Sequence, residues 1–164
     1  MVTKEKEELF EAAWEEGAPQ IRPEDMEDYI RFAYTKHPCA DRFFHISVKE
    51  AERGKVTLSM PLVKAYTNSG GFLYGGILAA LADAVSLGLI VSVGKSAVTI
   101  DMSMNFVRSS PVEGTLFING TVRHNGGRTL TLLADITDEK GRLLADVQTT
   151  MLVKGVLPEV PDTW

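Results

Sequence analysis

The sequence predicts an α+β protein in which an antiparallel sheet wraps around one long buried helix. Three observations predict this class. Two segments that alternate apolar and polar residues come first, an apolar stretch of helical length follows, and four more alternating segments complete the chain. The 164 residues, of which 45% are apolar and 24% charged, fit a single folded core.

Two amphipathic helices are expected before the sheet. Apolar residues recur on one side of the segment 3–16 at helical spacing. A second helix is expected from Pro23, whose fixed φ angle suits a first helical turn, to the residue before Pro38. We therefore expect a helical extension, a sheet domain and an extended or loosely docked tail, at residues 1–38, 39–155 and 156–164.

Alternation with a period of two marks the strands. The first pair spans residues 44–49 and 56–60, around a turn at Gly54. Four more segments follow, at 98–106, 115–124, 128–137 and 142–153. Turn residues between these four predict a meander of successive hairpins. In the first of them, Thr99 is expected on the face opposite to Met102.

The apolar stretch 74–93 contains no Lys or Arg and has a single carboxylate, Asp83, at its middle. A carboxylate at the centre of a bilayer costs about 2.5–3.5 kcal/mol, so we expect a helix buried on all sides in a protein core and no membrane partner. A buried carboxylate needs partners. Asp83 is therefore either satisfied by neighbouring hydroxyls or a catalytic base whose pKa is raised by desolvation, and we favour the base.

Two glycines, Gly75 and Gly76, begin this helix. They can present unpaired backbone N–H groups to a developing oxyanion, or they can allow close packing of the helix on the sheet. Gly75 precedes Asp83 by eight positions, so the two lie roughly 12 Å apart along the helix. One carbonyl cannot contact both. Because an uncovered sheet edge also invites pairing, we expect a homodimer or a dimer of dimers whose site combines two subunits.

The segment from Asn68 to Asp83 resembles the hotdog-fold acyl-CoA thioesterases of the phenylacetate-pathway and THEM type. Their motif is an Asn, then His-Gly-Gly at the start of a helix, then Asp or Glu. The resemblance extends over about residues 41–154 and implies a hotdog fold. It also implies that Asn68 polarises the carbonyl, that Gly75 forms the oxyanion hole, that Asp83 is the catalytic carboxylate and that Thr99 positions water. Tyr74 stands where the family has its histidine.

The expected reaction is hydrolysis of an acyl-CoA thioester to a free acid and CoA. Asp83 acts either as a base on water or as a nucleophile. Substrate-binding candidates are the apolar or small residues beside the helix start and two arginines that could pair with CoA phosphates: Phe72, Tyr74, Gly76, Arg108 and Arg128. For each arginine, ordinary surface solvation is the other interpretation.

Two other functions stay open on the sequence. A non-catalytic acyl-CoA-binding module would keep the cleft without the chemistry, and Tyr74 in place of histidine supports it. A hotdog hydratase or dehydratase would pair a histidine with the carboxylate, but His37, His45 and His124 all lie outside the helix motif.

Charge and cysteine content exclude several further classes. The net charge is −5 and the basic residues are scattered, so nucleic acid is not an expected partner. His37, Cys39 and His45 lack a further ligand for a metal, and we expect no cofactor beyond the CoA of the substrate. The single cysteine and a charged N-terminal segment without an apolar core predict a cytoplasmic protein.

Overall fold

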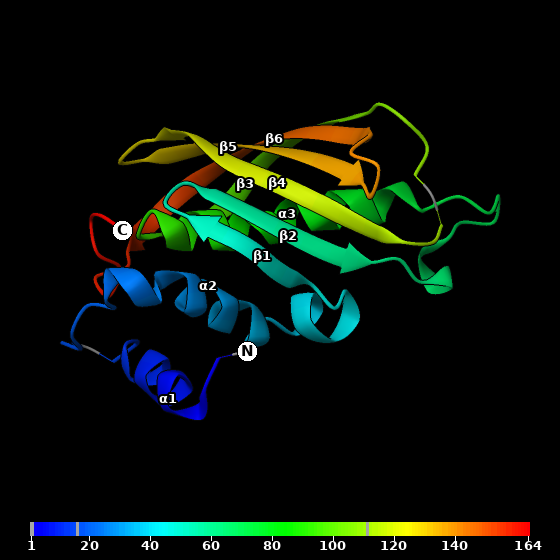
Figure 1. Cartoon of the computed structure of the whole chain (residues 1–164). Coiled ribbons are helices and arrows are strands. Elements are labelled where there is room, and N and C mark those ends of the chain that lie inside the picture. The colour runs from blue at the N-terminus through cyan, green and yellow to red at the C-terminus, as the bar shows by residue number, and fades with distance from the viewer. Residues whose placement is uncertain (1, 16, 111) are drawn as a thin grey trace.

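The computed structural model describes residues 2–15, 17–110 and 112–164, which form a six-stranded antiparallel sheet curved around one long helix (Figure 1). The central helix, α3, spans Gly75–Ser92. The strands are β1 Ser47–Glu52, β2 Lys55–Pro61, β3 Lys95–Phe106, β4 Thr115–Asn125, β5 Thr129–Asp138 and β6 Leu143–Val156. The predicted α+β class is confirmed.

The order of the strands across the sheet is β1-β2-β4-β5-β6-β3. β3 pairs with β6 and not with β4, so the predicted four-strand meander is wrong. The hairpins β4–β5 and β5–β6 do form. The physical reason is α3, because it carries the chain from β2 to the far edge of the sheet before β3 begins. The residues in the turns do not indicate that the chain crosses the sheet between β2 and β3.

A β-bulge in β3 changes which residues face the helix. Thr99 pairs with Met151 and Asp101 pairs with Thr150, which leaves Ile100 as an extra residue. Beyond the bulge Met102 pairs with Thr149, and both Met151 and Thr149 are buried. Directly paired residues share a face, so Thr99 and Met102 lie on the same, helix-covered face. The prediction that they lie on opposite faces is wrong, because uninterrupted alternation cannot anticipate an inserted residue.

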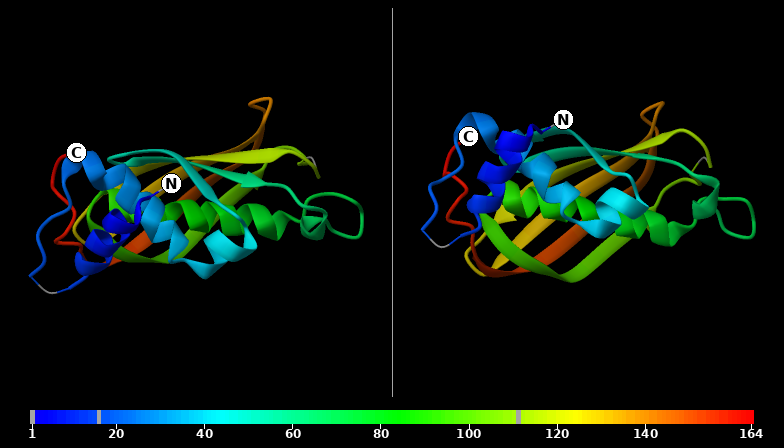
Figure 2. Two further views of the ribbon diagram at one scale, coloured as in Figure 1. Left: turned by 60° about the horizontal axis from the view of Figure 1, so that its bottom comes forward. Right: turned by 90° about the horizontal axis from the view of Figure 1, so that it is seen from below.

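The N-terminal extension consists of two helices, α1 Lys4–Ala12 and α2 Met26–Thr35. The final residue predicted for the first helix, Glu16, lies outside the described residues. α1 packs on α2 through aromatic contacts, and α2 lies beside α3, as Figure 2 shows. Arg31 of α2 donates to the backbone oxygens of Val48 and Lys49. The extension therefore covers the β1 edge of the sheet.

A π-helical turn, Cys39–Phe43, joins α2 to β1. The first strand was predicted from residue 44, but β1 begins at Ser47. The reason is a change of chain direction at His45, whose φ angle is 51°. The amide of Ile46 donates to the Ala40 oxygen at 2.8 Å, which holds the segment against the turn.

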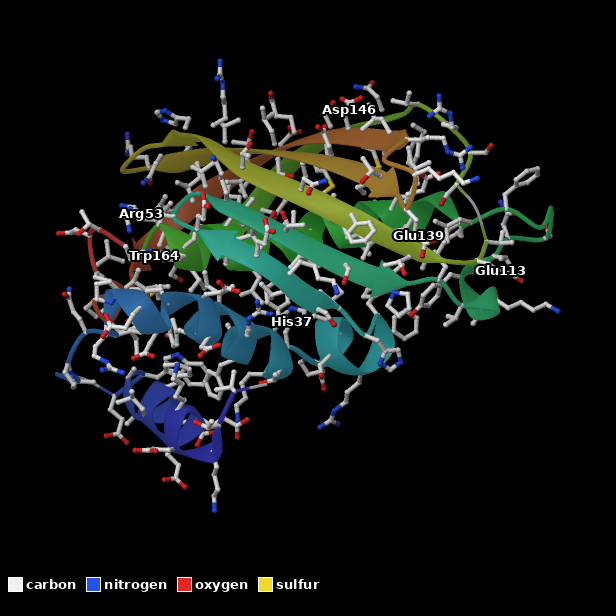
Figure 3. The ribbon with its side chains drawn as sticks, viewed as in Figure 1. His37, Arg53, Glu113, Glu139, Asp146 and Trp164 are labelled. Atoms are coloured by element: carbon white, nitrogen blue, oxygen red, sulfur yellow. The ribbon has the colours of Figure 1, made fainter. Side chains whose placement is uncertain are left out.

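The C-terminal tail is packed against the domain and not loosely docked. Glu159 is buried and accepts a 2.9 Å hydrogen bond from the Tyr29 hydroxyl of α2. At the end of α3, the Ser92 carbonyl accepts from the Trp164 indole at 3.0 Å and from Arg53 at 3.4 Å. Figure 3 shows Arg53 and Trp164 together at this end of the molecule. The tail thus supplies a C-terminal cap for the central helix.

α3 is only half buried, which corrects the prediction of a helix buried on all sides. Among the described residues it is the one helix long and apolar enough to span a bilayer, and here it packs on the sheet. Gly120 of β4 lies in tight contact with the helix. A Cβ atom there would lie 2.8 Å from Val85 Cγ2 and 2.9 Å from Leu89 Cδ1.

Gly120→Ala is therefore expected to lower the free energy of unfolding by about 1–3 kcal/mol, because the added methyl group overpacks the core. Urea denaturation measures the difference. Gly155→Ala in β6 is the matched control, since a Cβ there meets nothing within 4 Å. Equal stability of the two variants would contradict this account of the helix–sheet contact.

Candidate active site

The Asp83 carboxylate and the Thr99 hydroxyl meet where α3 passes β3. Thr99 Oγ1 donates to Asp83 Oδ1 at 2.8 Å. The bulge at Ile100 follows Thr99 directly, and because of it Thr99 and Met102 both lie on the face that α3 covers. The predicted catalytic carboxylate and the predicted water-positioning hydroxyl are therefore adjacent, and the hydrogen bond fixes the orientation of the carboxylate.

The environment of Asp83 differs from the one expected. The sequence predicts a carboxylate buried among apolar side chains, but Asp83 is exposed in the single chain. The reason is that α3 packs one side on the sheet, burying Leu81, Ala82 and Val85, while Asp83 lies on the other side. Desolvation of this carboxylate requires a covering group from outside the chain, either substrate or a second copy.

The N-terminus of α3 presents backbone donors. Tyr74 is the N-cap residue and its side chain makes no capping hydrogen bond. The first four N–H groups of a helix have no acceptor within that helix. A Cβ at Gly75 would lie 3.3 Å from the Phe106 ring, and a Cβ at Gly76 would lie 2.5 Å from the Tyr74 ring. Glycine at both positions thus serves close packing and also leaves the amides approachable.

Asn68 holds the loop that leads into α3. Its Oδ1 accepts from the amides of Gly70 at 2.9 Å and Phe72 at 3.1 Å. Both partners are donors, so the side-chain amide has a defined orientation and its Nδ2 group is the donor that it can offer. Phe72 and Tyr74, two predicted substrate-binding residues, are exposed on this loop. Asn68 and Gly75 therefore flank the same helix start.

The predicted site residues fall into separate places within one chain. Asp83 and Thr99 meet two helical turns beyond Gly75, so the acid and the oxyanion donors are not brought together. Arg108 and Arg128 contact opposite ends of β6, through Leu144 and Val153. Nine residues of strand separate these contacts by about 30 Å, so the two arginines cannot hold one phosphate in a single chain.

A pocket beside Asp83 contains residues that sequence reasoning missed. Its volume is about 230 Å³, and one wall is a face of α3 while the other is the segment before β1. The lining residues are His37, Cys39, Ala40, Phe44, Ala80, Asp83, Ala84 and Leu87. Figure 3 places His37 at the end of α2, below β1. The four helical positions follow i, i+3, i+4 and i+7 spacing, so the sequence alone places them on one face of the helix. The sequence does not indicate which segment lies opposite this face.

Tyr34 of α2 was also missed. Its hydroxyl donates to the Ala84 oxygen at 2.8 Å and accepts from the Gly88 amide at 3.1 Å, so it lies between two groups that pair with each other in a regular helix. Burial raises the pKa of the Tyr34 hydroxyl, against an opposing effect of the Gly88 amide, so it stays protonated as a donor. Gly88 leaves room for it, since a Cβ there would lie 3.0 Å from the hydroxyl oxygen.

In the described part of the chain, no three His, Cys, Asp or Glu side chains lie close enough together to form a metal-ligand cluster. Cys39 is exposed and lines the pocket beside Asp83. The Nδ1 atom of His37 accepts from the Ala40 amide at 3.3 Å, which connects this histidine to the π-helical turn.

The fold and the helix motif match known proteins. The sequence model of the Thioesterase superfamily matches residues 70–145. A Saccharolobus solfataricus protein that carries an esterase name is 27% identical over an alignment of 123 residues, which covers 72% of this chain and 87% of the relative. A hypothetical thioesterase of Streptococcus pneumoniae, solved with coenzyme A, is 29% identical with a TM-score of 0.67, covering 70% of this chain and 92% of that one. The chain belongs to the hotdog-fold thioesterase superfamily.

A Streptococcus mutans protein solved with acetyl-CoA is 30% identical, with a TM-score of 0.67 and coverage of 70% of this chain and 92% of that one. The Streptococcus pneumoniae protein has also been solved as two alanine variants, one of an aspartate and one of a threonine. Those two positions are 16 residues apart in that protein. Asp83 and Thr99 have the same spacing in this chain.

Proposed function

We propose that this protein hydrolyses an acyl-CoA thioester to the free acid and CoA, in the cytoplasm. The hydrogen bond between Thr99 and Asp83 carries the proposal, since it orients a carboxylate beside a pocket of ligand size. Membership of a thioesterase superfamily supports hydrolysis of a thioester. Two similar proteins that were solved with CoA or acetyl-CoA support a CoA ester as the substrate.

The chemistry needs one carboxylate and one set of oxyanion donors. A water oxygen attacks the thioester carbonyl carbon while one water proton passes to Asp83. The tetrahedral oxyanion then collapses, the C–S bond breaks and the CoA thiolate leaves. A thiol of pKa about 8–9 departs as an anion without an obligatory acid, and it takes up its proton afterwards. No cofactor beyond the CoA of the substrate is required.

Asp83 can also attack the carbonyl carbon directly. The thiolate then leaves first, a mixed anhydride forms on the carboxylate, and water cleaves this anhydride to the acid. Hydroxylamine separates the two routes, because it traps an anhydride as a hydroxamate on Asp83 and has no such target when Asp83 acts as a base.

The oxyanion donors in this proposal come from a second copy of the chain. Gly75 begins α3 about two turns before Asp83, and Asn68 lies in the loop before the helix, so neither donor reaches a carbonyl held at Asp83 of the same chain. The extension covers the β1 edge, whereas β3 has no neighbour on its outer side in the described part of the chain. Val98, Ile100 and Phe106 of β3 are 49%, 56% and 60% exposed. These features favour pairing of two copies along β3.

Thr99→Val is expected to lower kcat about 10- to 100-fold, because it removes a hydrogen bond to a charged group while keeping the shape of the side chain. Thr99→Ser should retain most of the rate. Asp83→Asn should lower kcat on the order of 10³-fold, because it removes the carboxylate that accepts the proton. Release of free thiol from short, long and aromatic acyl-CoAs measures all three. Tight acyl-CoA binding with no release by the wild-type protein would instead favour a binding module.

Ile100→Glu is expected to dissociate the dimer, because it places a charge on the uncovered edge strand. Sedimentation velocity measures the mass of the particle, and circular dichroism shows whether each variant is folded. Leu133→Glu is the matched control, since Leu133 is also exposed, at 37%, but lies in β5 within the sheet. A folded wild-type protein that sediments as a monomer would refute the shared site.

A further inference from the structure

We infer that the pocket beside Asp83 holds the acyl group of the thioester, and that the N-terminal extension determines which acyl group fits. This inference rests on the proposed function and names its substrate class, a compact apolar acyl group of about eight carbon atoms. The wall opposite α3, residues 37–44, is the segment that follows α2 of the extension and leads to β1, and it lies outside the residues 70–145 that match the superfamily. The extension acts on the pocket through this segment, because α2 leads directly into it.

The lining of the pocket sets its chemistry. On α3, Ala80 and Ala84 flank Asp83 and leave space, while Leu87 lies one turn further along the helix. On the other wall, Ala40 and Phe44 are buried, while His37 and Cys39 are exposed. The walls are thus predominantly apolar, and Asp83 is the one carboxylate among the lining residues. An acyl chain that enters with its carbonyl at Asp83 meets apolar side chains from there on.

The wall formed by residues 37–44 is held in place at both of its ends. Tyr34 ties α2 to α3 between Ala84 and Gly88, one turn from Asp83. The Tyr66 hydroxyl donates to the Phe43 oxygen, and the Phe44 ring packs 6.0 Å from the Tyr66 ring. The pocket is therefore preformed, and its size limits the ligand.

The volume indicates the size of the acyl group. An apolar cavity of about 150 Å³ accommodates benzene. The pocket here is about 230 Å³, enough for a ring with a short linker or for a chain of about eight carbons. Octanoyl and phenylacetyl groups share this chemistry, and both serve as probes. An acetyl group leaves the pocket mostly empty.

Binding to the Asp83→Asn protein tests the inference without turnover. Isothermal titration with acetyl-CoA, octanoyl-CoA and phenylacetyl-CoA measures what the acyl group adds to affinity. Each buried methylene contributes about a fourfold gain. With about half of the chain buried, octanoyl-CoA should bind on the order of 50-fold more tightly than acetyl-CoA. The tighter of octanoyl-CoA and phenylacetyl-CoA identifies the shape of the natural acyl group. Equal affinity for acetyl-CoA and both longer esters would overturn the inference.

Two reciprocal substitutions in the Asp83→Asn background test the location. Ala84→Leu narrows the pocket by three carbon atoms and should reduce the preference for octanoyl-CoA over acetyl-CoA by about 50-fold. Leu87→Ala widens it and should shift the preference toward longer chains such as dodecanoyl-CoA. Ala12→Leu, on the exposed surface of α1, is the control for added volume. A preference that neither pocket substitution changes would overturn the inference.

The outcomes separate this inference from the proposed function. In one outcome, the wild-type protein binds octanoyl-CoA, Ala84→Leu weakens this binding, and no thiol is ever released. Hydrolysis is then wrong and the pocket assignment stands. In the other outcome, the wild-type protein releases thiol and neither pocket substitution changes the acyl preference. Hydrolysis then stands and the pocket assignment is wrong.

Discussion

The site depends on one hydrogen bond between the central helix and the edge strand, from the Thr99 hydroxyl to the Asp83 carboxylate. It forms because a single inserted residue, Ile100, allows Thr99 and Met102 to lie on the same face, the one that α3 covers. Without that bulge, either Thr99 or the core methionines of β3 would point away from the helix. The bond therefore places the chemistry at the uncovered edge of the sheet, where a second copy of the chain can complete it.

The two edges of the sheet have different surroundings, and this difference links the extension to the proposed function. α2 covers β1, and Arg31 donates hydrogen bonds to backbone oxygens of that strand, so another strand cannot readily pair with the sheet on that side. The same helix reaches α3 through Tyr34, and the turn that follows it forms a wall of the pocket beside Asp83. The extension thus leaves β3 as the uncovered edge at which the proposed pairing occurs, and it also holds one wall of the pocket in place.

The sequence predicted the parts of the fold that have a local signal. Alternation located the strands to within a few residues, and the spacing of Gly75 and Asp83 separated the two halves of the site. It could not predict the place of β3 beside β6, because the residues in the turns carry no information about which distant strands pair. The bulge was missed because regular alternation cannot anticipate an inserted residue. The exposure of Asp83 was missed because the apolar stretch does not show which side of α3 packs on the sheet. Tyr34 was missed because its role depends on a helix 50 residues away.

The claim that two copies share each site is tested most directly by mixing two inactive proteins. Asn68→Asp keeps the oxygen that holds the loop and removes the Nδ2 donor, while Asp83→Asn removes the carboxylate. When the two variants are unfolded and refolded together, half of the dimers are mixed and each of these has one intact site. Thiol release should then return to about one quarter of the wild-type rate. No recovery in confirmed mixed dimers would contradict a shared site.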